Sequence, residues 1–401
     1  MNKNQVTYAK NSVINQTLEA NDLAFNIKKS SAIKNSVIKN INSYIPKHKF
    51  NTKEVISKIG HKFSDKLKSQ LLEMDIQERY VACDMNKFLN ENIFELTETN
   101  TGMSIKAVNE LIFKSDFDIK EIDHLITSTE TDDYISPGLS NVLIAECGFR
   151  NDIRHVSVAG MGCASIITLL GIAQDYIAIR PQAKVMILMS VLSSSFYQNI
   201  FDVDKFYTIE EIRKDESLSK NKEYHINNWL SIIQMFLFSD SASAMIITGD
   251  DVPGSDSGFK LIKNYHLSNI SKNDYKLAYF YHDKNKMKFH MDKKLPAKGL
   301  IYTKKLLQEI PAELKENIDA WIIHTGSKKI IDSVVSGCNI PYKKAKISYD
   351  ILNSYGNLSL CSLSMGLEIL QRRNFVAKGK LIGVIGFGNG FSANISILEN
   401  K

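Results

Sequence analysis

One cysteine lies in a sequence pattern that could activate it as a nucleophile. Cys163 belongs to the segment Gly160-Met-Gly-Cys-Ala-Ser165, between a predicted strand over 155–159 and a predicted long helix over 164–179. Glycines permit a tight turn at such a junction, and the free N–H groups at a helix N-terminus favour the thiolate form of cysteine. Most cysteines are small buried apolar residues, so a catalytic role for this one requires partners.

Two polar residues in the second half of the chain lie at comparable element ends. His324 ends a predicted strand over 321–323, and Asn357 follows Gly356 at the start of a helix predicted from residue 358. Taken singly, each is more often structural, the asparagine as a helix cap. Taken together, the three residues predict an active site with Cys163 as the nucleophile. The same order of residue types occurs in papain-like proteases, but their local signature around the cysteine is missing here.

The chain repeats itself in a way that would bring these residues together. Residues 122–127 resemble 318–323, residues 183–188 resemble 379–384, and Gly160 corresponds to Gly356, each at a separation of 196. The repeated apolar runs are typical of buried strands in sheets covered by helices. We therefore predict an α/β fold built from two βαβ-type copies with mixed, mostly parallel sheets.

The predicted organisation has three parts. An N-terminal arm covers 1–30, the first half covers 31–255 and the second half covers 256–401. The highly charged stretch 201–228 interrupts the first half, and we interpret it as a surface insertion, either a solvated decoration or a helical lid. The total of 401 residues exceeds the roughly 250 of a simple domain, and the duplication accounts for that excess.

Composition excludes several classes of protein. A net charge of +6 is weak for a chain of this length and does not indicate nucleic-acid binding. The polar N-terminus predicts no signal peptide, and no apolar run reaches the roughly 18 residues of a membrane span. Five well-separated cysteines indicate reduced thiols and a cytoplasmic location. No zinc pattern and no P-loop occur, so we expect neither metal nor cofactor.

A glycine-rich segment near the end of the chain has a structural interpretation. Gly386-Phe-Gly388-Asn-Gly390 superficially resembles a dinucleotide-binding loop, but only 11 residues follow it in this sequence. We expect a turn that packs closely against another part of the protein.

These segments, taken in order, resemble the thiolase-fold condensing enzymes, and more narrowly the type III (chalcone-synthase-like) polyketide synthases and β-ketoacyl-ACP synthase III. The similarity runs from about Ile33 to the C-terminus. It rests on six ordered motifs: Ser136-Pro-Gly138, Gly162-Cys-Ala164, Phe236-Leu-Phe-Ser-Asp-Ser-Ala-Ser-Ala244, Trp321-Ile-Ile-His-Thr-Gly326, Tyr355-Gly-Asn-Leu-Ser359 and Gly386-Phe-Gly-Asn-Gly-Phe391. The fold that the resemblance implies is a duplicated, layered αβαβα structure.

The resemblance also implies roles for individual residues. Cys163 would accept an acyl group from a thioester of coenzyme A or of a carrier protein, and would then react with a decarboxylated malonyl unit. His324 and Asn357 would stabilise the enolate, and His324 would also sustain the thiolate. Further substrate-binding positions follow by the same matching: Phe238 and Phe289 as gatekeepers between tunnel and cavity, Lys66 as a coenzyme A contact, and Ser136, Gly326 and Gly388 around the cavity.

The sequence also departs from the family pattern. Ser165-Ile166 replaces small glycines after the nucleophile, Ser190-Val-Leu192 replaces a segment that usually carries a glutamate, and 201–228 has no counterpart. Among the family's basic coenzyme A contacts, which precede the Arg79-Tyr80 pair, two positions become Ser69 and Glu73. A carrier-protein donor therefore stays open beside coenzyme A.

Three functions remain after this comparison. The first is an acyltransferase that performs type III-like decarboxylative condensation of acyl-CoA with malonyl-CoA in secondary metabolite biosynthesis. The second is a ketoacyl-ACP synthase III-like enzyme that performs one condensation with a carrier protein. The third is a catalytically silent partner subunit of a heteromeric synthase. The resemblance implies a homodimer in which Ser136 reaches the partner's cavity.

Overall fold

The computed structural model describes residues 35–199, 202–253, 256–283 and 286–401. Its centre is a nine-stranded mixed sheet with the order β11-β12-β13-β8-β1-β7-β6-β4-β5. A short ladder between β1 and β8 joins the strands of the two halves, pairing Val37 with Lys260 and Ile38 with Phe259.

The first half supplies five of these strands and three helices that cover them. β4 and β6 pair in parallel and are buried along almost their whole length, because their apolar side chains meet helices on both faces. The elements are β1 (Ser36–Tyr44), α4 (Asn100–Phe113), β4 (His124–Thr129), α5 (Leu139–Glu146), β5 (Arg154–Val158), α6 (Ser165–Ile179), β6 (Lys184–Val191) and β7 (Ser241–Gly249).

The second half repeats this arrangement. The spatial order β11-β12-β13-β8 matches β4-β6-β7-β1, and the three pairings in each set have the same directions: one parallel followed by two antiparallel. The elements are β8 (Phe259–Ser268), α10 (Leu295–Gln308), α11 (Ala312–Glu316), β11 (Ile318–Ile323), α12 (Lys328–Gly337), α13 (Tyr342–Tyr355), α14 (Ser362–Arg373), β12 (Leu381–Gly388) and β13 (Ser392–Asn400). The predicted duplication is therefore present in the strand order.

The two copies differ at one edge. Where the first half continues from α5 into the edge strand β5, the second half has the helix α13, so its part of the sheet ends at β11. The sheet is mixed, as predicted, but antiparallel pairing contributes more than the sequence suggested. Of the eight ladders in this sheet, three are parallel and five are antiparallel, because each half ends in a strand that returns beside its predecessor.

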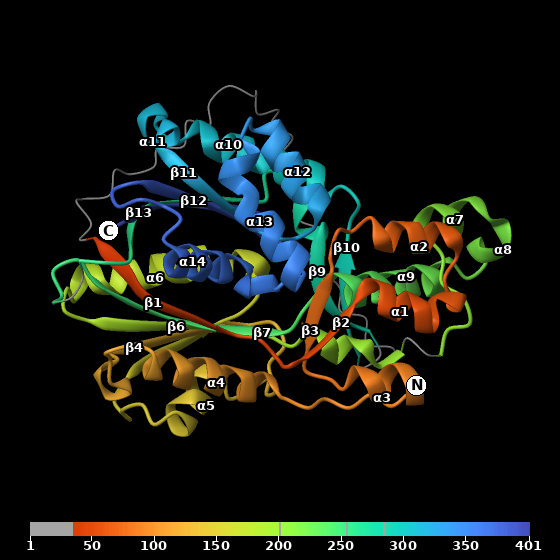
Figure 1. Cartoon of the computed structure of the whole chain (residues 1–401), viewed down its shortest axis with the longest axis horizontal. Coiled ribbons are helices and arrows are strands. Elements are labelled where there is room, and N and C mark those ends of the chain that lie inside the picture. The colour runs from red at the N-terminus through yellow and green to blue at the C-terminus, as the bar shows by residue number, and fades with distance from the viewer. Residues whose placement is uncertain (1–34, 200–201, 254–255, 284–285) are drawn as a thin grey trace, which may run out of the picture. The chain divides into compact units, whose positions relative to one another are not determined.

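Helices and strands alternate in layers, as Figure 1 shows. α4 and α5 cover one face of the first-half strands, and α10, α12 and α13 cover the outer face of the second-half strands. α6 and α14 lie between the two sets of strands and form the largest apolar cluster with them. This αβαβα order is the one that the resemblance implied. Within the described residues, only Gly162–Ile179, which includes α6, is long and apolar enough for a membrane span, and half of it is buried as core.

A further group of elements, here called the outer region, lies to the right of the layers in Figure 1. A short 3-10 turn over Gly60–Lys62 separates α1 from α2. The charged stretch 201–228 forms α7, α8 and the start of α9, and α7 begins with a capping box between Thr208 and Glu211. The elements are β2 (His48–Asn51), α1 (Thr52–Ile59), α2 (Asp65–Leu72), β3 (Glu78–Val81), α3 (Met85–Glu91), α7 (Ile209–Lys214), α8 (Glu216–Ser219), α9 (Lys222–Leu237), β9 (Ala278–Asp283) and β10 (Lys286–Met291).

Candidate active site

The nucleophile candidate lies in a turn that requires glycine. Gly160 and Gly162 have φ angles of 81° and 55°, in the left-handed region that side chains disfavour. Cys163 follows in a 3-10 turn over Gly162–Ala164, directly before α6. The second half has the matching turn at Ser359–Cys361 before α14. These two turns meet, since Cys163 Sγ and Ser359 Oγ, 196 residues apart, are 3.3 Å from each other.

The surroundings of Cys163 favour the neutral thiol. Burial raises the pKa of Cys163 to about 12, the hydrogen bond with Ser359 acts in the opposite direction, and the carboxylate of Glu130 adds to the increase. The sequence predicted that the helix N-terminus would favour the thiolate. Desolvation outweighs that effect in the resting protein.

Glu130 is a residue of this site that the sequence analysis missed. It follows β4, and its Oε1 accepts a 2.8 Å hydrogen bond from the backbone N–H of Gly162. Burial raises the pKa of this carboxyl, while backbone N–H groups of the nucleophile turn favour its charged form. The carboxylate therefore holds the turn that carries Cys163. No sequence signal pointed to it, because the contact joins residues 32 positions apart.

The glycine-rich segment packs closely against the same turn, as predicted, but Gly386 and Gly388 belong to the end of the strand β12 and only the residues after Gly388 form a turn. A Cβ atom on Gly388 would collide with the carbonyl oxygen of Met161, and a Cβ on Gly162 would lie 2.8–2.9 Å from atoms of Asn389. The end of β12 therefore approaches the nucleophile turn backbone to backbone. Only glycine allows this distance between the two halves.

His324 follows the last residue of β11. Its backbone N–H donates to the carbonyl of Ile385 on β12 at 2.8 Å, which fixes the position of the residue. Only 4% of its surface is exposed, and burial lowers the pKa of His324 to about 4. The imidazole is therefore neutral at pH 7. Its Nδ1 has no hydrogen-bond partner within the described residues.

Asn357 is held by both its backbone and its side chain. Its backbone forms an isolated bridge with Phe238, with hydrogen bonds of 2.8 Å to the carbonyl of Leu237 and 3.0 Å from the N–H of Ser239. Its Oδ1 accepts from the N–H of Ser359 at 2.8 Å. Because the amide oxygen is used in this way, the amide nitrogen is the group available to donate towards the cavity.

Two hydroxyl groups connect the histidine loop with the asparagine turn. Thr325 Oγ1 donates to Ser362 Oγ at 2.9 Å, and Ser362 Oγ lies 3.4 Å from Asn357 Oδ1. Both residues are completely buried. This short chain of hydrogen bonds couples the position of His324's loop to that of Asn357, and the sequence analysis did not identify it.

The three predicted catalytic side chains line one cavity. It is enclosed by residues of both halves: Cys163, Phe238, Ala278, Phe289, Met291, Leu295, Gly299, His324, Gly326, Ile330, Asn357, Phe387, Gly388, Asn389 and Phe391. The tertiary structure therefore brings together a nucleophile, a neutral imidazole and a primary amide in an otherwise mainly apolar space. Such a set can hold an acyl thioester and stabilise negative charge on a carbonyl oxygen.

Phe238 and Phe289 both line this cavity. Their rings meet edge to face, with centroids 6.2 Å apart and an interplanar angle of 78°. Both also line a second, small cavity, whose other residues are Glu130, Thr131, Val191, Ser193, Phe196, Gln234 and Ser359. The aromatic pair therefore lies between two cavities.

The remaining predicted positions divide into two groups. Gly326 and Gly388 line the cavity of Cys163. Lys66 instead lines a separate pocket in the outer region, and Ser136 is exposed and lines neither cavity. No group of three or more His, Cys, Asp or Glu side chains suited to a metal occurs in the part of the chain that the structure describes.

Comparison with known proteins agrees with this geometry. The family described as FAE1/Type III polyketide synthase-like protein matches residues 78–200, and the C-terminal family of 3-oxoacyl-[acyl-carrier-protein] synthase III matches 312–400. The alpha-pyrone synthesis polyketide synthase-like Pks18 from Mycobacterium tuberculosis is 26% identical over 277 residues, which are 67% of this chain and 63% of Pks18. The 1,3,6,8-tetrahydroxynaphthalene synthase from Streptomyces griseus is 22% identical, over 84% of each chain.

Solved structures show the same fold. The crystal structure of CsyB complexed with CoA-SH has a TM-score of 0.75, covering 91% of this chain and all of CsyB at 17% identity. The C-terminal type III polyketide synthase domain of Steely1 from Dictyostelium has a TM-score of 0.73 at 18% identity, over 91% of this chain. The chain therefore has the fold of these type III polyketide synthase structures, and it spans 63% of the length of Pks18, to which its sequence is similar.

Proposed function

We propose that this enzyme transfers an acyl group from a coenzyme A thioester to Cys163 and extends it with malonyl units by decarboxylative Claisen condensation. The observation that carries the proposal is the single cavity lined by Cys163, His324 and Asn357 together with the aromatic pair Phe238 and Phe289. Every group that this reaction needs faces one mainly apolar space.

The loading step begins from two neutral groups. His324 accepts the proton of the Cys163 thiol, and the sulfur attacks the thioester carbonyl. The carbon–sulfur bond to coenzyme A breaks, and the leaving thiolate takes up the proton. The products are an acyl-cysteine and free coenzyme A thiol. A neutral imidazole at pH 7 is the form that this proton transfer requires.

The condensation step uses His324 and Asn357 as hydrogen-bond donors. Malonyl thioester loses carbon dioxide, and the electron pair of the broken bond forms an enolate whose oxygen the two side chains stabilise. The enolate carbon then attacks the acyl-cysteine carbonyl. A carbon–carbon bond forms, the bond to Cys163 Sγ breaks, and the lengthened chain remains attached to coenzyme A.

The test combines radiolabelled malonyl-CoA with a panel of acyl-CoA starters. The wild type is expected to release labelled product, Cys163→Ala is expected to release none, and His324→Ala or Asn357→Ala is expected to slow decarboxylation by about 100-fold or more. Wild type that gives no Cys163-dependent product with any starter would contradict the proposal.

A ketoacyl-ACP synthase III-like reaction is the second candidate, favoured by the match of residues 312–400 to that family. It would give one extension only and would require a carrier protein. Intact-mass detection of an acyl adduct on Cys163 would exclude the third candidate, a silent partner subunit. For the assembled protein we propose a cytoplasmic homodimer, with Ser136 near the partner's cavity and no cofactor beyond the thioester substrates.

A further inference from the structure

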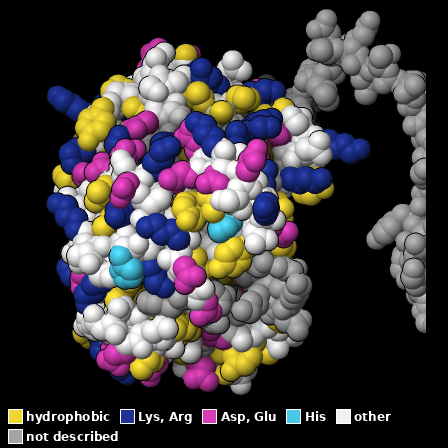
Figure 2. All heavy atoms as spheres, turned by 90° about the vertical axis from the view of Figure 1, so that its right-hand side faces the viewer, with side chains coloured by type: hydrophobic (Ala, Val, Ile, Leu, Met, Phe, Trp, Pro, Cys, Tyr) yellow, Lys and Arg dark blue, Asp and Glu magenta, His cyan; other side chains and the backbone are white. Residues whose placement is uncertain are grey.

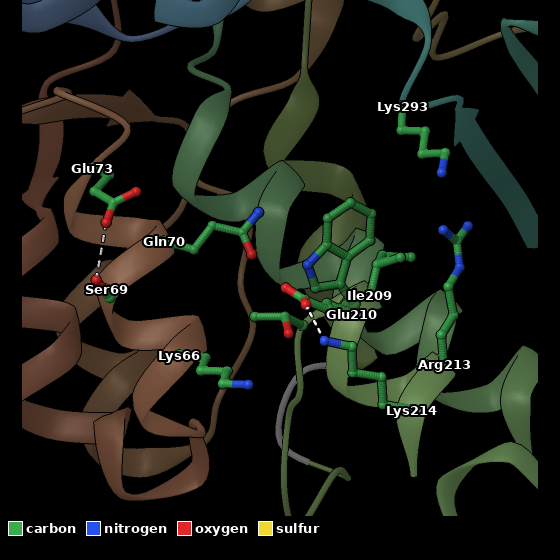
Figure 3. Close-up of a pocket in the computed structure, with 11 residues that line it drawn as sticks. Lys66, Ser69, Gln70, Glu73, Ile209, Glu210, Arg213, Lys214 and Lys293 are labelled. Carbon is green, nitrogen blue, oxygen red and sulfur yellow. Dashed lines mark hydrogen bonds and ion pairs between the residues drawn. The ribbon is translucent and has the colours of Figure 1, made fainter. Parts of the chain in front are cut away.

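A second pocket lies in the outer region, away from Cys163. α2 forms one wall with Lys66, Ser69, Gln70 and Glu73, and the insertion forms the opposite wall through α7. In Figure 3 the side chains of Arg213 and Lys293 extend towards each other on one side of the pocket, and Lys66 reaches in from α2 on the other. The insertion is therefore part of a built pocket and not only a solvated decoration.

Some charged side chains of this pocket are paired within the protein, and others are not. The acidic residue Glu210 is bound to Lys214 at 2.6 Å, and Glu73 accepts a hydrogen bond from Ser69 at 3.0 Å. Arg213 and Lys293 are exposed and form no ion pair with any described residue, whereas Lys66 is also exposed but helps to lower the pKa of Glu210 and Glu211. Two cations without a partner, with Lys66 beside the same space, are suited to a ligand that carries more than one negative charge.

The pocket also contains an aromatic donor. Trp229 of α9 lines it, and the indole Nε1 has no hydrogen-bond partner in the described part of the protein. An indole can stack on a heterocyclic base, and its unused N–H can donate to a polar ligand atom. Figure 2 shows that the surrounding face mixes acidic and basic side chains, so the unpaired cations are a local feature and not part of a broad basic surface.

Two elements connect this pocket with the active site. β10 carries Phe289 and Met291, which line the cavity of Cys163, and Lys293 of the outer pocket follows two residues later. Four residues span at most about 14 Å. α9 likewise runs from Trp229 to its C-cap residue, Phe238. Two elements therefore bring residues of the outer pocket close to residues that line the cavity of Cys163.

We propose that the insertion supplies a binding site for the nucleotide phosphates of a coenzyme A thioester, formed by Arg213 with Lys293 and Lys66 beside the Trp229 indole. The inference rests on the proposed function, because it assumes a coenzyme A donor. A carrier protein would bring a single phosphodiester, which leaves most of these cations without a partner.

The direct test measures binding of 3′-phosphoadenosine 5′-phosphate and of coenzyme A by calorimetry and by tryptophan fluorescence. The chain has two tryptophans, and Trp321 is buried in β11, so Trp229 is expected to report binding. Arg213→Ala and Lys293→Ala are each expected to weaken binding of both ligands by about tenfold, with a smaller loss of affinity for dephospho-coenzyme A. The control is Lys220→Ala, a cation of the insertion outside the pocket, which is expected to bind like wild type.

The proposal would be overturned if both variants bound 3′-phosphoadenosine 5′-phosphate and coenzyme A as tightly as wild type. It would also be overturned if the variants lost only the acylation of Cys163 by a phosphopantetheinylated carrier protein. A separate measurement distinguishes this failure from failure of the proposed function. An N-acetylcysteamine thioester has no nucleotide, so acylation of wild-type Cys163 by it tests the chemistry alone. If the pocket binds the nucleotide, Arg213→Ala lowers the ratio of acylation rates from the coenzyme A and N-acetylcysteamine thioesters by about tenfold.

Discussion

At the scale of single residues, the resting active site holds two uncharged groups. The pKa of Cys163 is raised to about 12 and that of His324 is lowered to about 4, each mainly by burial. A thiolate–imidazolium pair is therefore not the resting state, and the proton moves only when a substrate is attacked. Because His324 is neutral above about pH 5, its titration does not limit activity between pH 6 and 8.

The carboxylate of Glu130 gives a test of these electrostatics. Replacement by glutamine keeps an oxygen that can accept from Gly162 N–H, but it removes a negative charge that opposes ionisation of Cys163. The pKa of the thiol should fall, so Glu130→Gln should react with iodoacetamide roughly three- to tenfold faster at pH 8–9 than wild type. The rate is measured by intact mass, with Cys163→Ala to identify the site. An unchanged or slower rate would contradict the role assigned to Glu130.

At the scale of elements, the site depends on how closely β12 approaches the nucleophile turn. Gly386 and Gly388 face residues of that turn, and Asn394 Nδ2 of β13 lies 3.5 Å from the carbonyl of Ala164. The β12–β13 hairpin of the second half therefore packs against the turn that carries Cys163 and helps to hold it in place. The same hairpin carries Phe387, which lines the cavity.

Gly388→Ala tests this approach. The added methyl group would meet the carbonyl of Met161, so the two segments must separate, at a cost of about 1–3 kcal/mol in the free energy of unfolding. Condensation activity should fall together with the stability, because Cys163 moves relative to Asn357. Thermal melting and product formation are the measurements.

The matched control is Gly171→Ala in α6, where a Cβ would meet only Asn264 Nδ2 at 3.8 Å. Alanine is the better helix former there, so this variant should be as stable as wild type or up to about 1 kcal/mol more stable. Equal melting temperatures for the two variants would contradict a special role for the approach at Gly388.

At the scale of the whole molecule, the loop after β4 presents apolar side chains to solvent. Ile135 is fully exposed and Tyr134 is 55% exposed in the single chain, directly before Ser136 and the cis bond to Pro137. Adjacent exposed apolar residues of this kind are typical of an interaction surface. Their position next to Ser136 agrees with the predicted homodimer.

Light scattering tests the predicted homodimer. Wild type should be a dimer, and Ile135→Asp should weaken the dimer by about 100-fold or more, since a charge would be buried where an apolar contact is expected. Phe375→Asp changes another exposed apolar residue, 61% exposed and in the second half, and should leave the dimer intact. A monomeric wild type, or a dimer that tolerates Ile135→Asp, would refute the prediction.

The sequence by itself determined the elements and motifs whose signals depend only on residues close together in the chain. The apolar runs of β4, β6, β11 and β12 recur at one separation, which predicted the duplication, while the family resemblance implied the order of the layers. Cys163, His324 and Asn357 were recognisable because each lies at an element end within a short motif. Such signals need only neighbouring residues, which is why they can be read without a structure.

The tertiary structure decided everything that depends on contacts between distant segments. Glu130, the Ser359 contact with Cys163 and the Thr325–Ser362 link join residues 32 to 196 positions apart. The helix α13 in place of a second edge strand and the position of the insertion opposite α2 also depend on packing. Burial, which reverses the expected ionisation of Cys163, is a property of the assembled core. No local sequence pattern predicts these features, because they depend on contacts and burial that arise only when distant segments meet in the folded chain.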